Sequence, residues 1–205
     1  MATIGEFDLS AEGFEAVIFD CDGTLVNSMP SHFEAWCEAL ALHGAGGIFK
    51  EDVFYAMGGR PTKDIVVEIN DVYGLKLDPE RVAFAKREAF LKKLGQLDLI
   101  EEVAAFAESL RGKVPMAIAT GGTRLVIEKT LQAVGVSDLF EEVVTADDVP
   151  VGKPAPDIFL KAAKLLGVSP LKCLVLEDAP AGVMAAQLAG MQVIAVPAPL
   201  NFARK

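Results

Sequence analysis

Four short apolar runs, partly β-branched, most constrain how this 205-residue chain can fold. They cover residues 16–19, 116–119, 173–176 and 193–196, with a weaker fifth run at residues 143–144. None of them alternates apolar with polar residues, which is typical of strands that are covered on both faces of a sheet. We therefore predict a sheet of about five largely parallel strands.

Stretches with helical spacing lie between these runs, as the connections of a parallel sheet require. They cover residues 100–110, 124–134, 156–166 and 181–189. Gly135, Gly167 and Gly190 follow three of them, at the position where a left-handed residue commonly ends a helix. The pattern predicts a three-layer α/β core with helices on both faces of the sheet.

The segment after the first predicted strand breaks this alternation. It contains no convincing strand, but it has helical stretches at residues 32–42, 51–57, 62–73 and 79–94. Asp78 is suited to cap the last of these helices and Pro79 to begin it. We predict two units, a core formed by residues 1–26 and 99–205 and a helical domain inserted at residues 27–98.

Composition excludes several classes of function. The chain has 19 Lys and Arg against 29 Asp and Glu, a formal net charge of −10, whereas nucleic-acid binding needs clustered basic residues. No apolar run approaches the roughly 20 residues of a membrane span, and no secretory signal is visible. The three cysteines are widely spaced, which is typical of reduced thiols rather than of disulfides. We expect a cytoplasmic protein, a monomer or weak dimer, with no nucleic-acid or membrane partner.

Polar side chains follow the predicted strands where each strand ends. In chain order they are Asp20, Asp22, Thr120, Gly121, Lys153, Glu177 and Asp178. Each has an ordinary explanation when taken alone, such as a turn, a solvated loop or a helix cap. Because the carboxyl ends of parallel strands meet at one edge of the sheet, we expect all of them to converge there.

The chemistry of these groups suits phosphoryl transfer. Several carboxylates at one point need a cation between them, and oxygen ligands favour Mg²⁺. A Thr hydroxyl, the backbone amides of a Gly pair and a Lys ammonium can bind a phosphoryl group. An Asp can attack phosphorus and carry it as an aspartyl phosphate, while a second carboxylate two positions later moves the protons.

Four motifs in this order resemble those of the haloacid dehalogenase superfamily, specifically its β-phosphoglucomutase-like branch. They are Asp20-Cys21-Asp22-Gly23-Thr24, then Thr120, then Lys153 in Gly-Lys-Pro-Ala-Pro-Asp, then Glu177-Asp178. The resemblance extends from about residue 14 to residue 197. It implies a Rossmann-like core and an inserted four-helix cap that closes over the site.

The resemblance also implies a role for each motif residue. Asp20 would be the nucleophile and Asp22 the general acid and base. The phosphate would be bound by Thr120, Gly121 and Lys153. A Mg²⁺ ion would be held by the Asp20 carboxylate, the Asp22 backbone carbonyl and Asp178, with Glu177 close by.

Two rivals use similar residues. A response-regulator receiver also combines Asp, Thr, Lys and Mg²⁺, but its acidic pair and its phosphorylated Asp come from different strands, and no helical domain follows its first strand. A catalytically idle relative that only binds a phosphorylated ligand is the second rival. The intact motifs favour an enzyme.

The inserted domain bears on whether this enzyme is a phosphatase or a mutase, since both occur in the branch. His32 matches a position that takes part in acid–base gating in the mutase, although it could be an ordinary residue of an amphipathic helix. Arg60 and Lys63 are candidates to contact the substrate, although they could equally belong to a solvated loop. Pro61 and Thr62 depart from the mutase pattern, and one register places Glu88 where the mutase has Lys. A mutase must hold phosphates at both ends of a bisphosphate, so losing a cation would weaken that grip.

We therefore expect a Mg²⁺-dependent phosphatase that acts on a small phosphorylated metabolite, a sugar phosphate, and resembles fructose-1-phosphate phosphatases. The alternative is a β-phosphoglucomutase that interconverts β-glucose 1-phosphate and glucose 6-phosphate.

Overall fold

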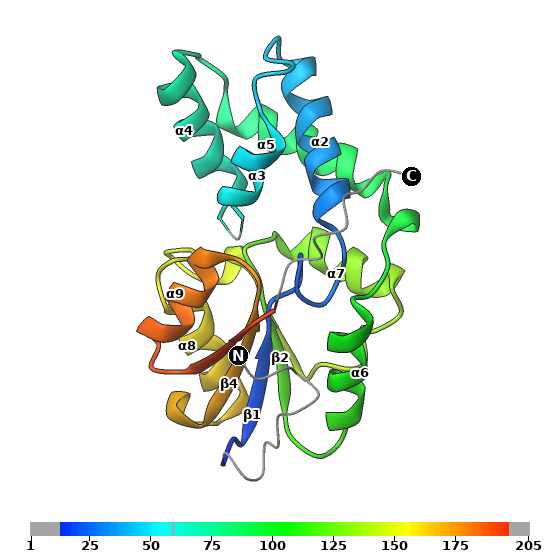
Figure 1. Ribbon diagram of the computed structural model, residues 1–205, viewed down its shortest axis with the longest axis vertical. Coiled ribbons are helices and arrows are strands. Elements are labelled where there is room, and N and C mark those ends of the chain that lie inside the picture. The colour runs from blue at the N-terminus through cyan, green and yellow to red at the C-terminus, as the bar shows by residue number, and fades with distance from the viewer. Residues whose placement is uncertain (1–12, 59, 197–205) are drawn as a thin grey trace.

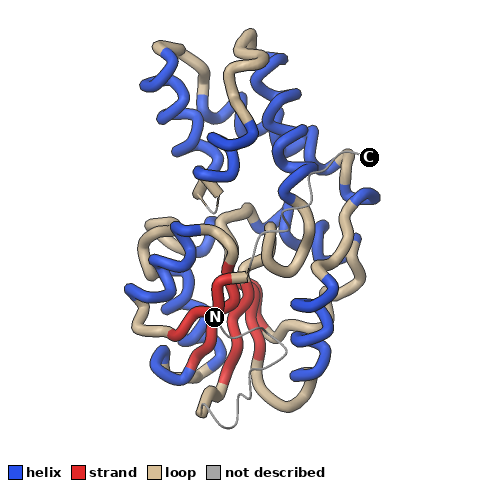
Figure 2. The backbone as a smooth tube through the Cα atoms, viewed as in Figure 1, coloured by secondary structure: helices blue, strands red, loops and turns tan. Residues whose placement is uncertain are grey.

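A computed structural model describes residues 13–58 and 60–196 of the chain. At its centre is a parallel sheet of five strands in the order β3-β2-β1-β4-β5 (Figures 1 and 2). The strands are β1 (Ala16–Phe19), β2 (Met116–Ala119), β3 (Glu142–Val144), β4 (Cys173–Glu177) and β5 (Gln192–Ala195). The predicted α/β fold class is confirmed.

Helices cover both faces of the sheet, as the unbroken apolar strands require (Figure 1). On one face lie α6 (Glu101–Leu110) and α7 (Arg124–Ala133), and on the other lie α8 (Asp157–Leu166) and α9 (Pro180–Leu188). In β1, Val17 and Phe19 pack toward the first pair, whereas Ala16 and Ile18 pack toward the second pair. Successive side chains of a strand point to opposite faces, so this short strand contributes to two apolar cores.

The element boundaries differ little from the prediction. The strand predicted at residues 173–176 extends to Glu177, and the last strand begins at Gln192 and ends at Ala195. Within the described residues, three 3₁₀ turns complete the connections, namely η2 (Leu94–Gln96), η3 (Ala146–Asp148) and η4 (Pro170–Lys172). Gly135, Gly167 and Gly190 have φ angles of 76°, 71° and 75°, which confirms the predicted left-handed helix ends.

Four helices pack together over the carboxyl ends of the strands and form what we call the helical lobe (Figure 1). They are α2 (Met29–Leu42), α3 (Glu51–Ala56), α4 (Thr62–Tyr73) and α5 (Pro79–Leu91). The lobe has its own apolar cluster, which includes Trp36, Phe54 and Ile69. Asp78 caps α5 as predicted, since its Oδ1 accepts the backbone N–H of Glu80 at 2.9 Å.

The chain leaves the sheet for the lobe and returns to it along adjacent segments. The Asn27 backbone N–H donates to the Asp98 carbonyl at 2.9 Å, and Ile100 donates to the Leu25 carbonyl at 2.9 Å. Phe90, near the end of α5, is fully buried in the core cluster shared with α6 and α7. The lobe is therefore connected to the core by two adjacent chain segments and by packing at one end of α5.

Two compositional expectations can be compared with the described residues. Along residues 13–58 and 60–196, no helix combines the length and the apolar character that a membrane span requires. The three cysteines are unpaired, with Cys21 and Cys173 buried and Cys37 exposed.

Candidate active site

A buried lysine joins two carboxylates at the carboxyl ends of β1 and β4. Nζ of Lys153 lies 2.6 Å from Oδ1 of Asp20 and 2.6 Å from Oε2 of Glu177. Burial alone would lower the pKa of Lys153, but the charges of the two carboxylates outweigh burial and raise this pKa. Lys153 is therefore an ammonium group held against Asp20 out of contact with solvent.

Three carboxylates gather beside this lysine. Asp20, Glu177 and Asp178 each offer one oxygen, and these oxygens lie within 4.8 Å of one another. Burial, followed by the charge of Glu177, raises the pKa of Asp20 and raises the pKa of Asp178 to about 7. A cation would relieve this repulsion, and the oxygen-only donor set fits a hard divalent ion.

Hydrogen bonds and two glycines fix the orientation of these carboxylates. Thr24 Oγ1 donates to Asp178 Oδ1 at 2.8 Å, and the Ala179 backbone N–H donates to Glu177 Oε1 at 2.9 Å. A Cβ atom at Gly23, whose φ is +92°, would overlap the Asp178 carboxylate, and one at Gly182 would overlap that of Glu177. Both glycines thus allow backbone to approach the carboxylates closely.

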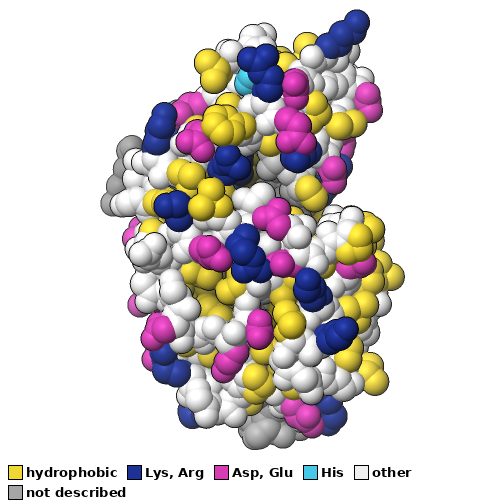
Figure 3. Space-filling view, turned by 180° about the vertical axis from the view of Figure 1, so that it is seen from behind, with side chains coloured by type: hydrophobic (Ala, Val, Ile, Leu, Met, Phe, Trp, Pro, Cys, Tyr) yellow, Lys and Arg dark blue, Asp and Glu magenta, His cyan; other side chains and the backbone are white. Residues whose placement is uncertain are grey.

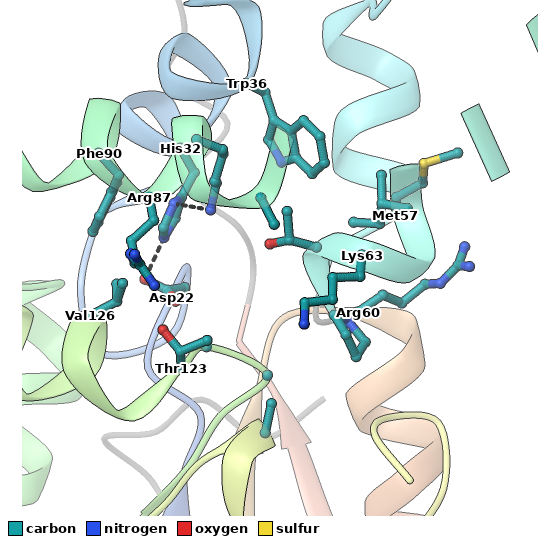
Figure 4. Close-up of a pocket in the computed structure, with 18 of the residues that line it drawn as sticks. Asp22, His32, Trp36, Met57, Arg60, Lys63, Arg87, Phe90, Thr123 and Val126 are labelled. Carbon is teal, nitrogen blue, oxygen red and sulfur yellow. Dashed lines mark hydrogen bonds and ion pairs between the residues drawn. The ribbon is translucent and has the colours of Figure 1, made fainter. Parts of the chain in front are cut away.

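Asp22 belongs to a second polar chain, which links the core to the helical lobe (Figure 4). Its Oδ1 accepts the hydroxyl of Ser28 at 2.5 Å and lies 2.9 Å from Nε2 of His32. On the other side of the ring, Nδ1 of His32 lies 2.9 Å from Nζ of Lys86. The imidazole stacks on Phe90, with ring centroids 3.8 Å apart and an interplanar angle of 9°.

The protonation of this chain follows from its surroundings. Burial, then the charge of Lys86, lowers the pKa of His32, so the imidazole is neutral near pH 7. Burial lowers the pKa of Lys86 to about 8. For Asp22, burial acts to raise the pKa, but His32 and Ser28 outweigh it and the pKa is lowered. Asp22 is therefore ionised.

A cavity of about 950 Å³ separates the helical lobe from the carboxyl end of the sheet. Seven of the nine predicted site residues line it: Asp20, Asp22, His32, Arg60, Thr120, Gly121 and Asp178. Lys153 and Glu177 lie behind Asp20, with fully buried side chains. Arg60 is in the cavity wall, but its Nη1 pairs with Glu68 Oε2 at 2.6 Å, and its side chain extends away from Asp22 (Figure 4). The predicted site residues thus lie at this cavity or directly behind Asp20, but the guanidinium of Arg60 is turned away from the others.

Comparison with known proteins identifies the family. Residues 14–190 match the family model of the haloacid dehalogenase-like hydrolases. The chain belongs to this family. The match confirms the resemblance seen in the motifs and excludes the response-regulator receiver.

Individual relatives and solved structures agree with this family assignment. The chain is 37% identical over 187 residues to fructose-1-phosphate phosphatase YqaB of Escherichia coli strain K12, covering 90% of this chain and 97% of the relative. It is 34% identical over 199 residues to hexitol phosphatase A of the same strain, covering 91% and 85%. A crystal structure of CbbY from Rhodobacter sphaeroides in complex with phosphate shares the fold, with a TM-score of 0.81, 24% identity and coverage of 94% and 90%. The chain is accordingly a phosphoric monoester hydrolase, as the sequence predicts.

The structure bears on one register in the lobe of this hydrolase. That Glu88 lies where the mutase has Lys stays a prediction, but Lys86 is the residue of α5 that reaches His32, and Glu88 is exposed. Lys86 and Phe90 are four residues apart on a helix, so the burial of Phe90 places Lys86 on the same face. A cation is therefore present at this wall, and its supposed loss no longer argues against a mutase.

Ser28 was also missed by the sequence analysis. It precedes α2 and is fully buried, and its hydroxyl binds the acid–base candidate Asp22. A Ser just before a predicted helix is usually interpreted as a helix cap, so the sequence gives no sign that its hydroxyl binds Asp22. In this structure Ser28 makes no side-chain cap, so its hydroxyl is available to Asp22.

Proposed function

We propose that this chain is a Mg²⁺-dependent phosphatase that hydrolyses a small phosphorylated sugar or sugar alcohol through an aspartyl phosphate on Asp20. One observation carries the proposal: at the cavity wall, Oδ1 of Asp20 is held 2.6 Å from a buried ammonium, and one oxygen of this carboxylate lies within 4.8 Å of an oxygen of Glu177 and of Asp178. A carboxylate positioned in this way can attack phosphorus, because positive charge beside it stabilises the phosphoryl oxygens as charge develops on them.

In this proposal the substrate phosphate lies against Asp20. The Asp20 oxygen forms the new bond to phosphorus while the bond to the sugar oxygen breaks. Thr120 and the backbone N–H of Gly121 bind phosphoryl oxygens, and Lys153 neutralises part of their charge. Water then hydrolyses the aspartyl phosphate, so that the net products are the free alcohol and inorganic phosphate.

The metal fits the acidic group at this edge of the sheet. Asp20, Asp178 and the backbone carbonyl of Asp22 would hold Mg²⁺, with Glu177 completing the negative charge around it. Bound Mg²⁺ supplies neutralisation of the phosphoryl oxygens during transfer.

Asp22 would be the general acid and base. It gives a proton to the sugar oxygen as that bond breaks and later takes a proton from the attacking water. Since Asp22 is ionised in this arrangement, it must first gain a proton from water, while the Nε2–H of the neutral His32 ring donates a hydrogen bond to its Oδ1 and orients the carboxylate.

Residues 27–98 would act as a cap domain that encloses the substrate. The separate apolar cluster of the helical lobe and the paired crossings at Asn27 and Asp98 support this assignment. A cavity of about 950 Å³ is large enough for a phosphorylated hexose. The relatives named for fructose 1-phosphate and hexitol phosphates make these esters the first candidates.

Phosphate release measures the proposed activity directly. With Mg²⁺ present, we expect fructose 1-phosphate or a hexitol phosphate to release inorganic phosphate, and β-glucose 1-phosphate provides the contrast. Formation of glucose 6-phosphate without release of phosphate would instead indicate the mutase. Asp20→Asn should abolish turnover, while Asp138→Asn, an exposed Asp paired with Arg111, should not. Turnover that survives in Asp20→Asn would refute the proposed mechanism.

A further inference from the structure

Three of the cations that the helical lobe places in the cavity wall are engaged with other side chains. Arg60 pairs with Glu68 at 2.6 Å, and Lys63 pairs with Oε1 of Glu80 at 2.6 Å. Lys86 is engaged with His32, as described above. A substrate could recruit any of these groups only by competing with an existing short contact.

Arg87 is different. Its Nε is shielded from solvent, yet it has no hydrogen-bond partner among the residues that the structure describes. Its ion-pair partner is the adjacent Glu88, an oxygen of which lies 3.5 Å from Nε without forming a hydrogen bond. The side chain as a whole is 35% exposed, and Arg87 is one of the residues that line the cavity. A buried donor without a partner costs free energy, which a bound ligand would recover.

The position of Arg87 suits contact with the part of the substrate that leaves. Its guanidinium carbon lies 5.0 Å from the centroid of Phe84, one turn earlier on α5, and this contact holds the side chain along the helix. Figure 4 shows Arg87 extending from α5 toward the side of the cavity where Asp22, Thr123 and Val126 lie. Asp22 is the proposed acid for the leaving oxygen, so Arg87 faces the group bonded to that oxygen.

The chemistry of the wall indicates what Arg87 binds. A guanidinium presents a rigid, planar set of N–H donors that matches two neighbouring oxygen atoms. The same cavity exposes the carboxylates of Glu80 and Asp147, and charges of both signs are interspersed where the lobe meets the core (Figure 3). Hydroxyl groups both donate and accept, so a neutral polyol matches this mixed wall.

We propose that Arg87 determines the specificity for the leaving group, with its guanidinium binding two neighbouring hydroxyl groups of a phosphorylated sugar or sugar alcohol whose phosphate lies at Asp20. This inference rests on the proposed phosphatase function and deepens it. It assigns recognition of the leaving group to α5 rather than to Arg60.

The test compares substrates with and without hydroxyl groups. In Arg87→Gln, we expect kcat/KM for fructose 1-phosphate to fall about tenfold or more, mainly through KM, because a charge-assisted hydrogen bond to the leaving group is lost. Hydrolysis of p-nitrophenyl phosphate, which has no hydroxyl group in its leaving group, should change less than about twofold. Arg87→Lys should rescue little, because Lys lacks the planar set of donors. Lys92→Gln, at the end of α5, is exposed and controls for the change in charge.

Binding separates this inference from the catalytic proposal. In the Asp20→Asn background, calorimetry should show that Arg87→Gln weakens the binding of fructose 1-phosphate but not the binding of inorganic phosphate. The role of Arg87 would be overturned if Arg87→Gln lost as much kcat/KM with p-nitrophenyl phosphate as with fructose 1-phosphate, or if its affinity for fructose 1-phosphate were unchanged. A wild-type preference for fructose 1,6-bisphosphate that disappears in Arg87→Gln would also overturn it, by showing that Arg87 binds a second anion. If the wild type releases phosphate from no ester, the phosphatase proposal fails, while the affinity comparison still decides on Arg87.

Discussion

Nζ of Lys86 lies 2.9 Å from Nδ1 of His32, and this contact determines which imidazole nitrogen carries the proton. An ammonium group can only donate, so Nδ1 accepts and the proton of the neutral ring is on Nε2. That proton points to Oδ1 of Asp22 at 2.9 Å. The charge of Lys86 on the helical lobe thereby directs the ring proton of His32 toward Asp22 on the core. These contacts exist only while the lobe and the core are in this relative position.

The first prediction concerns the alkaline side of the pH profile. Because burial lowers the pKa of Lys86 to about 8, this side chain is charged below that pH and loses its charge as the pH rises through it. A neutral amine no longer obliges Nδ1 to accept, and the positive charge near Asp22 disappears. We expect kcat/KM of the wild type to decline above about pH 8.

Lys86→Met provides the check on this assignment. It should lower kcat/KM at neutral pH and flatten the decline above about pH 8, since the group that titrates is gone. Lys92→Met, an exposed lysine at the end of the same helix, should keep the wild-type profile. If kcat/KM of Lys86→Met declined at the same pH and to the same extent as in the wild type, another group would be responsible for the loss of activity at alkaline pH.

The second prediction concerns Lys153 as a counter-ion. Lys153→Met would leave the carboxylates of Asp20 and Glu177 buried without their partner, which costs on the order of 3–5 kcal/mol of unfolding free energy. Without that ammonium the pKa of Asp20, already raised by burial, rises further, and the folded protein binds more protons than the unfolded chain. Stability of the variant should therefore fall as pH rises from about 5 to 8.

Urea unfolding at several pH values measures this effect. Adding Glu177→Gln to Lys153→Met should recover part of the lost stability but no activity, because one buried charge is removed while the phosphate still lacks its lysine. A loss of stability that is the same at acid and alkaline pH would show that packing, not charge, explains it.

The sheet and the carboxylate cluster could be predicted because they depend on the order of the strands alone. Residues 16–19 and 116–119 match β1 and β2 to the residue, since an unbroken buried run has polar residues at its ends. Asp20, Lys153 and Glu177 are far apart in sequence, yet parallel strands bring their carboxyl ends to one edge. The start of α5 was equally accessible, because a capping side chain, Asp78, precedes a proline there, whereas α2 begins three residues before the predicted helix and α5 ends three residues before the predicted end.

The lobe wall could not be predicted in the same way. Which residue of α5 faces the cavity depends on how that helix is rotated against α2 and the core, and periodicity alone leaves this rotation open. The burial of Phe90 in the core sets it and brings Lys86 to His32. The missing hydrogen-bond partner of Arg87 Nε is likewise a three-dimensional property, because sequence does not tell which of several nearby carboxylates an arginine meets.

The third prediction uses a glycine in α9. In Gly182→Ala the added methyl group would overlap the Glu177 carboxylate, which must then move away from Lys153. We expect a loss of about 1–3 kcal/mol in unfolding free energy and a larger relative loss of kcat, because the ammonium beside Asp20 is displaced with it. Gly95→Ala is the matched control, since its Cβ would have open space around it. A Gly182→Ala enzyme with wild-type kcat would show that the position of Glu177 does not affect the reaction.

The last prediction links the metal to pH through Asp178. Burial and the charge of Glu177 raise the pKa of Asp178 to about 7, so in metal-free protein the folded state holds a proton that the unfolded chain has already released. Stability of the metal-free protein should therefore fall as pH rises from about 4 through 7. Protons compete with Mg²⁺ for this carboxylate, so the Mg²⁺-dependent rise in Tm should be larger at about pH 8 than at about pH 5.

Asp178→Asn separates the two contributions to that result. The amide cannot titrate and is a weaker ligand for a hard cation, so the fall in metal-free stability should become smaller, with the raised pKa of Asp20 accounting for what remains, and most of the Mg²⁺-dependent rise in Tm should disappear. Asp138→Asn, on the exposed surface, should retain both. If Asp178→Asn lost the pH dependence but kept the full response to Mg²⁺, the metal would have to be held by other groups, and Asp178 would be a buried acid of the site rather than a ligand.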